Sequence, residues 1–341
     1  MKSQPPKSKV TLGEIARSLG LAQSTVSRAL AGNPAISDET RRRVIDEAEK
    51  LEYRNRTSHA IVPPRKIVGV VVAALHNQFY VHFLDYLHDE LRSFGYHMTL
   101  IIDSLSDKED FSAFEPLLQQ YIDGVVFATA SVDSRLAERL HETGLPVVLA
   151  VRTIDGLPFD SVEVDNAVAG REAINHLAEL GHSRIGFILG PRDTSTSRDR
   201  YAGALNAMAD LGMTPDPRHA VWGAFTHASG YSSLVSLINL PDPPTAVVCG
   251  NDTIAIGALE AAHKHNIAIP AQLSIIGFDD ISMAGWEMVR LTTIRQPIRE
   301  MAALAARRLV ERMRGAADLA PRHDVLPVSL IKRDTTGPVG V

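Results

Sequence analysis

Residues 23–30 carry short polar side chains and one arginine on what the spacing predicts to be one face of a helix. Val26, Ala29 and Leu30 form an apolar stripe at helical spacing, so the other side chains point outward. These outward side chains are Gln23, Ser24, Thr25, Ser27 and Arg28. Amide, hydroxyl and guanidinium groups of this size bond to base edges and phosphates when a helix enters the major groove of DNA. The segment could therefore read DNA, although an ordinary three-helix bundle would show the same pattern.

Two more helices are expected to position this segment. Thr11 and Glu14 form a capping-box pattern at the start of an amphipathic helix, which Gly20 ends. Ser37 can cap a third helix over residues 38–51. Two helices joined by a tight glycine turn, with polar side chains on the second, are typical of a helix-turn-helix.

The charge distribution favours a polyanionic partner for this part of the chain. Residues 1–66 contain 13 lysines and arginines against 7 acidic residues, whereas the remaining residues contain 22 against 33. A small basic region before a large acidic one suggests that the basic region alone meets a nucleic acid. A charged tail that serves only solubility is the plainer interpretation.

The chain from residue 67 onward predicts an α/β domain, because β-rich runs alternate with helical stretches. The predicted strands are 67–73, 98–102, 124–128, 147–151, 161–164, 184–189, 220–225, 246–249 and 273–278. A pause at residues 155–158 favours two subdomains with parallel sheets. The predicted fold is thus an all-α helix-turn-helix headpiece followed by a two-subdomain α/β domain.

Polar and aromatic side chains follow many of these strands. Parallel sheets bind ligands beyond the carboxyl ends of their strands. The segments at those ends are 75–80, 151–152, 191–200, 225, 251–252, 279–280 and 296. Carboxylate, amide and guanidinium groups suit paired hydroxyls, and aromatic rings suit the apolar side of a sugar. Each of these residues could instead serve a turn, a surface ion pair or the core.

Residues 10–30, followed by residues 32–37, closely resemble the headpiece of the lactose-repressor (LacI/GalR) family. Thr25-Val26-Ser27-Arg28 is the most specific fragment, and the resemblance extends to about Thr336. The resemblance implies a bacterial transcriptional regulator, most simply a repressor. Its effector domain would be similar to periplasmic sugar-binding proteins.

The resemblance assigns DNA contacts to positions that match the family motif. Those positions are Leu12, Gln23, Ser24, Thr25, Ser27, Arg28 and Ser37. Gln23 and Ser24 match the pair that determines which base sequence is bound. Thr25, Ser27 and Arg28 match residues that contact phosphate or fix the register. Ala22 departs from the pattern, because relatives often place a serine N-cap there. That loss costs about 1 kcal/mol of local helix stability.

The linker after Tyr53 follows the family pattern only in part. Asn55 matches the family asparagine, but Arg54 stands where a proline is expected. Ile61 takes the position of a leucine that wedges into the minor groove. We expect a hinge helix over about residues 55–61 that forms only on DNA, because so short a helix is unstable alone. A plain extended linker is the alternative.

The resemblance also assigns effector contacts in the α/β domain. The matching positions are Phe79, Tyr80, Arg152, Arg200, Phe225, Asn251, Asp279 and Gln296. Val151 stands where the family often has an aspartate, so we expect a less hydroxylated or differently oriented ligand. A mono- or disaccharide is the predicted effector, with a nucleobase or a phosphorylated metabolite as the alternative. Trp222 matches no family position and is predicted to be a packing residue.

The predicted domains are the headpiece at 1–54, the hinge at 55–66 and the effector-binding and dimerisation domain at 67–341. Within the last, the first subdomain spans about 67–158 with part of 297–320, and the second spans about 161–291 with 324–336. The predicted assembly is a homodimer on a pseudo-palindromic operator. No leucine heptad follows Thr336, so a tail-driven tetramer is not expected.

Several other classes of protein are not expected. The single cysteine, Cys249, suits a reducing cytoplasm, and no apolar run is long enough to span a bilayer. The polar first ten residues lack the apolar core of a secretory signal. No nucleophile elbow, phosphate loop or zinc-protease motif is present, and the histidine spacing is poor for a metal, so we expect no enzyme, cofactor or metal site. A transport binding protein would share the α/β domain but would have no use for the basic headpiece.

Overall fold

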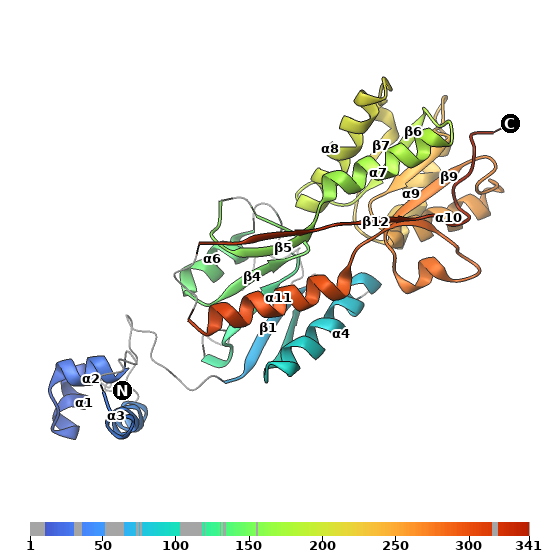
Figure 1. The fold of residues 1–341 in the computed structure, drawn as a ribbon. Helices are drawn as coiled ribbons and strands as arrows, with labels where there is room; N and C mark the ends of the chain where they lie inside the picture. Colours follow the sequence, from blue (N-terminus) through green and yellow to red (C-terminus); the bar gives the residue numbers. More distant parts are fainter. Residues whose placement is uncertain are drawn as a thin grey trace, which may run out of the picture. The chain divides into compact units, whose positions relative to one another are not determined.

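The computed structural model describes most of the chain (Figure 1). The described residues are 11–30, 36–51, 65–72, 75, 77–102, 118, 120–129, 131, 134–154, 156–315 and 320–340. They divide into two compact units, Met1–Arg65 and Lys66–Val341. The predicted hinge contacts Asn55 and Ile61 lie outside the described residues. No helix in the described part is long and apolar enough to cross a membrane.

The first unit contains three helices around a small apolar core. They are α1 (Leu12–Leu19), α2 (Gln23–Leu30) and α3 (Asp38–Lys50). Each helix contributes a completely buried residue to the core: Ile15, Val26 and Val44. The Glu14 carboxylate accepts a 2.6 Å hydrogen bond from the Thr11 backbone N–H, and Gly20 ends α1 with a φ of 67°. The predicted helix-turn-helix is confirmed.

Six described strands of the second unit form a parallel sheet in the order β11-β5-β4-β3-β1-β2. They are β1 (Ile67–Val72), β2 (His97–Ile102), β3 (Gly124–Phe127), β4 (Val147–Ala150), β5 (Asp160–Val164) and β11 (His323–Leu326). Helices α4 (Gln78–Ser93) and α11 (Ile298–Met313) pack together on one face of the sheet, and α6 (Arg135–Thr143) covers the other. Val70 packs in the apolar cluster on the face covered by α4 and α11, and Val71 packs in the cluster on the face covered by α6. Alternate residues of a strand point to opposite faces of the sheet.

A second sheet of six described strands has the order β12-β10-β9-β8-β6-β7. They are β6 (Ile185–Leu189), β7 (Ala220–Trp222), β8 (Ala246–Cys249), β9 (Ser274–Asp279), β10 (Thr292–Arg295) and β12 (Ser329–Ile331). Only β12 pairs in the antiparallel direction, with β10. Strand β7 ends at Trp222, earlier than the predicted residue 225, so Phe225 lies in the loop that follows.

Two helix pairs cover the two faces of the second sheet. They are α7 (Asn166–Glu179) with α8 (Ser195–Asp210), and α9 (His227–Ile238) with α10 (Asp252–Lys264). The Phe187 ring of β6 meets the Tyr201 ring of α8 edge-on at 5.1 Å, whereas the preceding Gly186 lies against Leu237 of α9. The pairs therefore lie on opposite faces. Two short 3₁₀ helices, η1 (Pro217–His219) and η2 (Ser282–Gly285), complete the described elements.

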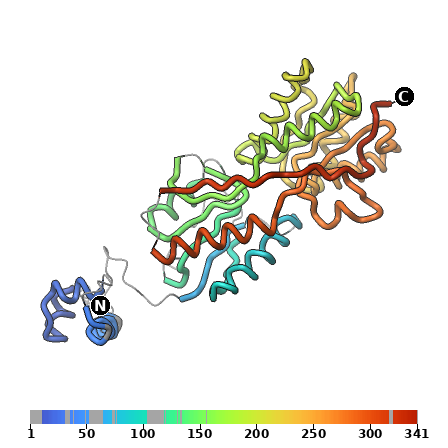
Figure 2. The backbone as a smooth tube through the Cα atoms, viewed as in Figure 1, coloured from blue at the N-terminus to red at the C-terminus, as the bar shows by residue number. Residues whose placement is uncertain are grey.

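Three described connections link the two sheets, as Figures 1 and 2 show. They follow β5, β10 and β11 and lead to α7, α11 and β12, respectively. The predicted subdomain boundaries were wrong here, because they assigned residues 161–164 and 324–326 to the second subdomain. Strand β5 pairs with β4 and with β11, so all three belong to the first sheet.

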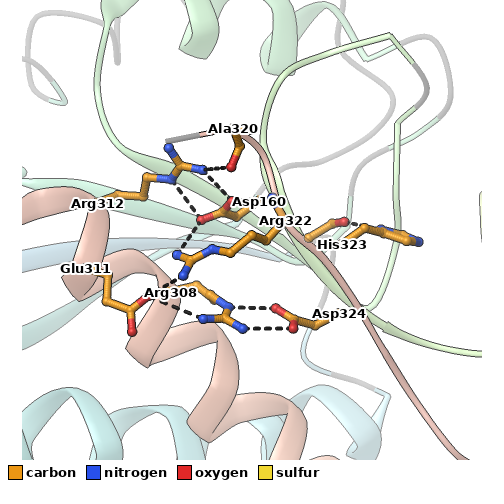
Figure 3. Close-up of polar contacts among 9 residues, drawn as sticks. Asp160, Arg308, Glu311, Arg312, Ala320, Arg322, His323 and Asp324 are labelled. Carbon is orange, nitrogen blue, oxygen red and sulfur yellow. Dashed lines mark hydrogen bonds and ion pairs between the residues drawn. The ribbon is translucent and has the colours of Figure 1, made fainter. Parts of the chain in front are cut away.

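A network of ion pairs fixes the returning strand β11 to the first sheet (Figure 3). The carboxylate of Asp160 accepts hydrogen bonds of 2.8 and 2.6 Å from Arg312 of α11 and of 2.7 Å from the backbone N–H of Arg322. Arg308 of α11 donates to Asp324 of β11 at 2.7 and 2.9 Å. Burial acts to raise the pKa of Asp160, but the bonds from Arg312 and Arg322 outweigh it and hold the pKa below its usual value. The network joins β5, α11 and β11.

Candidate functional site

The outer surface of α2 presents the predicted DNA-contacting side chains. Gln23, Ser24, Ser27 and Arg28 are exposed, and Thr25 is half-buried. Arg28 donates a 3.2 Å hydrogen bond from Nε to the Ser24 carbonyl one turn earlier, which holds its guanidinium along the helix surface. The helix thus offers amide, hydroxyl and guanidinium groups on one side.

The remaining predicted contacts in the first unit are placed differently. Leu12 is half-buried and packs against the apolar core, so little of its side chain is available to a partner. Ser37 is exposed, and its hydroxyl accepts a 3.3 Å hydrogen bond from the Thr40 backbone N–H, which confirms its predicted capping of α3. Ala22 has no side-chain acceptor at the start of α2; its carbonyl accepts from Thr25 and Val26.

A pocket in the second unit brings together all the predicted effector residues. Its lining consists of Asn77, Phe79, Tyr80, Val151, Arg152, Thr196, Arg200, Phe225, Asn251, Asp279 and Gln296. These residues come from both halves of the unit: Tyr80 and Arg152 belong to the part around the first sheet, and Arg200 and Asp279 to the part around the second. Phe79 and Tyr80, which belong to the segment expected beyond the first strand, lie in the first turn of α4. The pocket holds about 280 Å³ of space outside the protein atoms, part of it open to solvent.

Arg200 is held rigidly in the pocket wall by neutral oxygen atoms. Its Nε donates to Oδ1 of Asn166 (2.9 Å) and its Nη1 donates to the carbonyl of Gly250 (2.6 Å). The guanidinium lies over the Phe278 ring, 3.3 Å from the ring centre. Burial lowers the pKa of Arg200 to about 10, so the side chain remains charged at neutral pH. It can donate hydrogen bonds to a ligand hydroxyl or anion.

Asp279 and Gln296 form a buried pair opposite this arginine. Gln296 Nε2 donates to Asp279 Oδ1 at 2.7 Å. Burial raises the pKa of Asp279 well above its usual value, although the charge of Arg200 acts to lower it. The neighbouring Asp280 does not line the pocket; it forms ion pairs of 2.6 Å with Arg295 and with Arg333. Asp280 therefore stabilises the turn that carries Asp279.

Asn251 and Asp252 have separate tasks. Oδ1 of Asn251 caps α10 by accepting from the Ile254 N–H (2.9 Å), which leaves its Nδ2 directed elsewhere. Asp252 is completely buried and accepts hydrogen bonds from Thr293 (2.6 Å) and from the Ile281 N–H (2.9 Å). Burial raises the pKa of Asp252 to about 6 against these hydrogen bonds. Asn251 lines the pocket. Asp252 joins the start of α10 to β10 and to the loop after β9 through these hydrogen bonds.

Backbone strain marks two strand ends at this pocket. Val151, directly after β4, has a φ of 71°, and Asp279, at the end of β9, has a φ of 124°. Such conformations cost about 1–3 kcal/mol for residues other than glycine and cluster at functional sites. The ring of Phe225 packs directly against Gly190, where an added Cβ would lie 2.2 Å from the ring. These features support a ligand site at this position.

Several buried polar atoms in the pocket have no hydrogen-bond partner among the described residues. They are Nε of Arg152, Nδ2 of Asn251 and Oε1 of Gln296. Such atoms are rare in folded proteins, because an unpaired buried polar group is costly. They are two donors and one acceptor, and all three belong to residues that line the pocket.

The structure adds two polar residues that were not assigned individually from the sequence, Asn77 and Thr196. Asn77 caps α4 through Oδ1, which accepts from the Phe79 N–H at 3.0 Å, and Thr196 lies in the first turn of α8. Both fall within segments expected beyond strand ends, which was the only signal available. Trp222 packs edge-on against Tyr201 at 5.3 Å and does not line the pocket, as predicted.

A helix-turn-helix unit followed by an α/β unit of two sheets with a polar pocket defines a DNA-binding protein with a ligand-binding domain. Comparison with known proteins identifies its family. Residues 11–55 match the description "Bacterial regulatory proteins, lacI family", and residues 174–336 match "Periplasmic binding protein-like domain". The chain belongs to the LacI family of bacterial transcriptional regulators, as the following relatives show.

The HTH-type transcriptional regulator DegA of Bacillus subtilis (strain 168) is 31% identical over 336 residues, which cover 97% of this chain and 99% of DegA. The HTH-type transcriptional repressor CytR of Escherichia coli (strain K12) is 30% identical over 320 residues, or 92% of this chain and 93% of CytR. Among solved structures, the complex of the transcriptional regulator CelR with cellobiose has a TM-score of 0.73 at 28% identity, covering 96% of this chain and 100% of CelR. The lac repressor dimer bound to operator, at 24% identity and a TM-score of 0.70, shares the fold. The protein is a DNA-binding transcriptional regulator and not an enzyme.

Proposed function

We propose that this regulator is a repressor whose operator affinity is controlled by a small carbohydrate bound in the pocket of the second unit. The observation that carries the proposal is the convergence of all eight predicted effector residues, from widely separated segments, on one pocket. The strained backbone at Val151 and Asp279 and the unpartnered polar atoms at the same place support it.

For the operator, we propose that α2 enters the major groove and that Gln23 and Ser24 read base edges. Both side chains are exposed in the first turn of α2, and a glutamine amide can form two hydrogen bonds with adenine. Thr25, Ser27 and Arg28 contact phosphates and fix the register, with Ser37 at the backbone beside them. Asn55 and Ile61 remain predicted hinge contacts on the DNA.

For the effector, a mono- or disaccharide fits the chemistry of the pocket. Carboxylate, amide and guanidinium groups surround it, and Phe79 and Phe225 offer apolar surfaces. The similarity to CelR, whose solved complex contains cellobiose, also supports a sugar.

A nucleobase is the second candidate. The unpartnered Nδ2 of Asn251 and Oε1 of Gln296 are a donor and an acceptor, which could pair with the edge of a base. The aromatic rings of Tyr80 and Phe225 could stack on its face. A phosphorylated metabolite is a further alternative.

We propose that the protein acts as a homodimer in the cytoplasm, with two recognition helices on a pseudo-palindromic operator about one helical turn apart. Because the pocket is lined from both sheet regions, a ligand that binds them together changes the angle between them. The affinity for DNA then changes by the factor by which the two conformations differ in ligand affinity. DNA binding changes the affinity for the ligand by the same factor. Light scattering that shows only monomer at micromolar concentration would contradict the dimer.

The test is to select DNA from a random duplex library with the full-length protein and then measure affinity by fluorescence anisotropy. We expect enrichment of an inverted repeat. Arg28→Ala should lose binding to it, whereas Arg17→Ala, which removes an exposed arginine from α1, should retain most of it. Arg200→Ala should bind the operator normally and lose its response to ligand. Normal operator binding by Arg28→Ala across a salt series would show that α2 is not the recognition helix.

A further inference from the structure

Two arginines face the pocket without an acidic partner. Arg152 is 5% exposed and Arg200 is 8% exposed. Nη1 of Arg152 donates to the carbonyl of Thr129 at 3.1 Å, and Arg200 donates to an amide oxygen and a backbone carbonyl. Neither guanidinium forms an ion pair with any residue in the described part of the chain. Arg152 also lies over the Phe225 ring, 5.6 Å from its centre, as Arg200 lies over Phe278. A buried guanidinium without an ion pair is still costly, and an anion would offset that cost.

The first turn of α8 lies beside Arg152. The residue after it, Thr153, donates its backbone N–H to Oγ of Ser195 at 3.0 Å, and Ser195 is the first residue of the helix. Thr196, the second residue, is 3% exposed and lines the pocket with Arg152. The free N–H groups and partial positive charge of a helix N-terminus favour a negatively charged group.

The balance of charge along the pocket lining is positive. Arg152, Arg200 and Asp279 are its ionisable residues besides Tyr80. Burial lowers the pKa of Arg200, and the charge of Asp279 acts to raise it. The positive charge of Arg152 acts to lower it, so the two guanidinium groups repel each other. Burial favours the neutral form of Asp279 by raising its pKa. Nε of Arg152 has no hydrogen-bond partner among the described residues, so a buried donor remains available to a negatively charged ligand.

We propose that the effector is a small hydroxylated acid, whose acidic group is held by Arg152 and the first turn of α8 and whose hydroxyls are held by Arg200, Asn251 and Asp279. The inference rests on the proposed function and narrows its ligand class. A carboxylate and a phosphate share the chemistry that recognises the site, because each offers several oxygens to a guanidinium and to helix N–H groups. An uncharged sugar would leave Arg152 uncompensated.

Matched ligand pairs test this directly by thermal unfolding of the full-length protein at constant ionic strength. The carboxylate arm compares glucuronate with glucose and galacturonate with galactose. The phosphate arm compares glucose 6-phosphate with glucose. We expect at least one acid to raise the Tm by several degrees near 100 times its Kd, and to exceed its neutral partner. The arm that responds identifies the acidic group.

Arg152→Gln removes the charge at the site, and Arg171→Gln removes an arginine elsewhere in the same unit whose side chain is 43% exposed. We expect Arg152→Gln to weaken binding of the acid about tenfold or more with little effect on the neutral partner, and Arg171→Gln to change neither. Thr196→Val, which removes only a hydroxyl, is a second variant in case Arg152→Gln does not fold. It should reduce the preference for the acid over its neutral partner.

The inference is overturned if no acid in the panel exceeds its neutral partner. It is also overturned if the preference for the acid persists unchanged in the Arg152→Gln or Thr196→Val variant. Stabilisation by neutral sugars alone would overturn the acidic effector and leave the proposed sugar-responsive regulator standing. Failure of the proposed function appears separately, as absence of sequence-specific DNA binding by the same protein.

Discussion

Arg200 in the pocket wall and Asn166 at the start of α7 are joined by a 2.9 Å hydrogen bond from the guanidinium Nε to the amide Oδ1. Nδ2 of the same amide donates to the carbonyl of Val164 at 3.1 Å. Val164 ends β5 in the first sheet, and Asn166 begins the first helix that covers the second. The position of the pocket arginine is therefore tied to one of the connections between the sheets.

Asn166→Ala should weaken binding of an effector by about 5–150-fold, because it leaves a buried charged donor unsatisfied at a cost of about 1–3 kcal/mol. Asn239→Ala, which changes an exposed asparagine at the end of α9, is the matched control. Titration calorimetry with a ligand found by thermal shift measures the effect. Unchanged affinity in Asn166→Ala would show that Arg200 does not depend on this bond.

Asp160→Asn should destabilise the second unit by about 3 kcal/mol, because it removes the buried carboxylate that pairs with both Arg312 and Arg322. The matched control is Asp210→Asn, which breaks the exposed Arg171–Asp210 pair and should cost less than about 1 kcal/mol. Urea unfolding measures both. Equal losses in the two variants would show that the network in Figure 3 does not fix β11.

Stability of the second unit should fall as the pH drops below 6.5, partly because of His182. Its ring is buried among Thr245, Ser274 and Gly337, with three contacts of 3.0 Å. Burial lowers the pKa of His182 from 6.5, so the unfolded chain takes up a proton at a higher pH than the folded one. Stability is therefore lost from pH 6.5 downward, until the folded-state pKa is reached.

The variant His182→Gln should flatten this dependence of Tm on pH, whereas His88→Gln, at an exposed histidine, should leave it unchanged. The slope between pH 7.5 and pH 5.5 is the quantity to compare, because His182→Gln also changes the stability at every pH. An identical slope in the wild type and in His182→Gln would exclude this histidine as a source of the acid sensitivity.

Glu163 should make the stability of the second unit depend on pH in the opposite direction to His182. Burial, with the charge of Asp199, raises the pKa of Glu163 from 4.5 to about 7, so the folded chain holds a proton that the unfolded chain releases. Stability from this group is present below pH 4.5 and is lost as the pH rises to about 7. Glu163→Gln should therefore raise the Tm above pH 7, by about 2–4 °C for each kcal/mol recovered. Glu179→Gln, at an exposed glutamate, is the control; a lower Tm in Glu163→Gln at pH 8 would contradict the assignment.

Much of the local structure could be predicted from the sequence. The helices of the first unit follow from apolar spacing and from Thr11, Gly20 and Ser37, whose effects act within one turn. The strand positions follow from short buried runs. The sheet to which β5 and β11 belong could not be predicted, because it depends on pairing between residues more than 150 positions apart, such as Ser161 and His323.

The pocket could be predicted as a set of segments but not as a set of contacts. The strand-end rule for parallel sheets predicted the segments, and the resemblance to the LacI family assigned Arg152, Arg200 and Asp279 within them. These residues belong to two different sheets, so sheet geometry alone could not place them together. The sequence could not show that Arg152 meets a carbonyl rather than an acid, since that depends on the neighbours that tertiary packing supplies. The strained φ of Val151 likewise has no signature in a valine.

The most direct test is the affinity of the full-length protein for its selected operator, measured by anisotropy with and without the acid that most raises its Tm. We predict that the ligand changes the operator Kd by at least about fivefold in the wild type and not in Arg200→Ala. A ligand that raises the Tm but leaves the operator Kd of the wild type unchanged would contradict it.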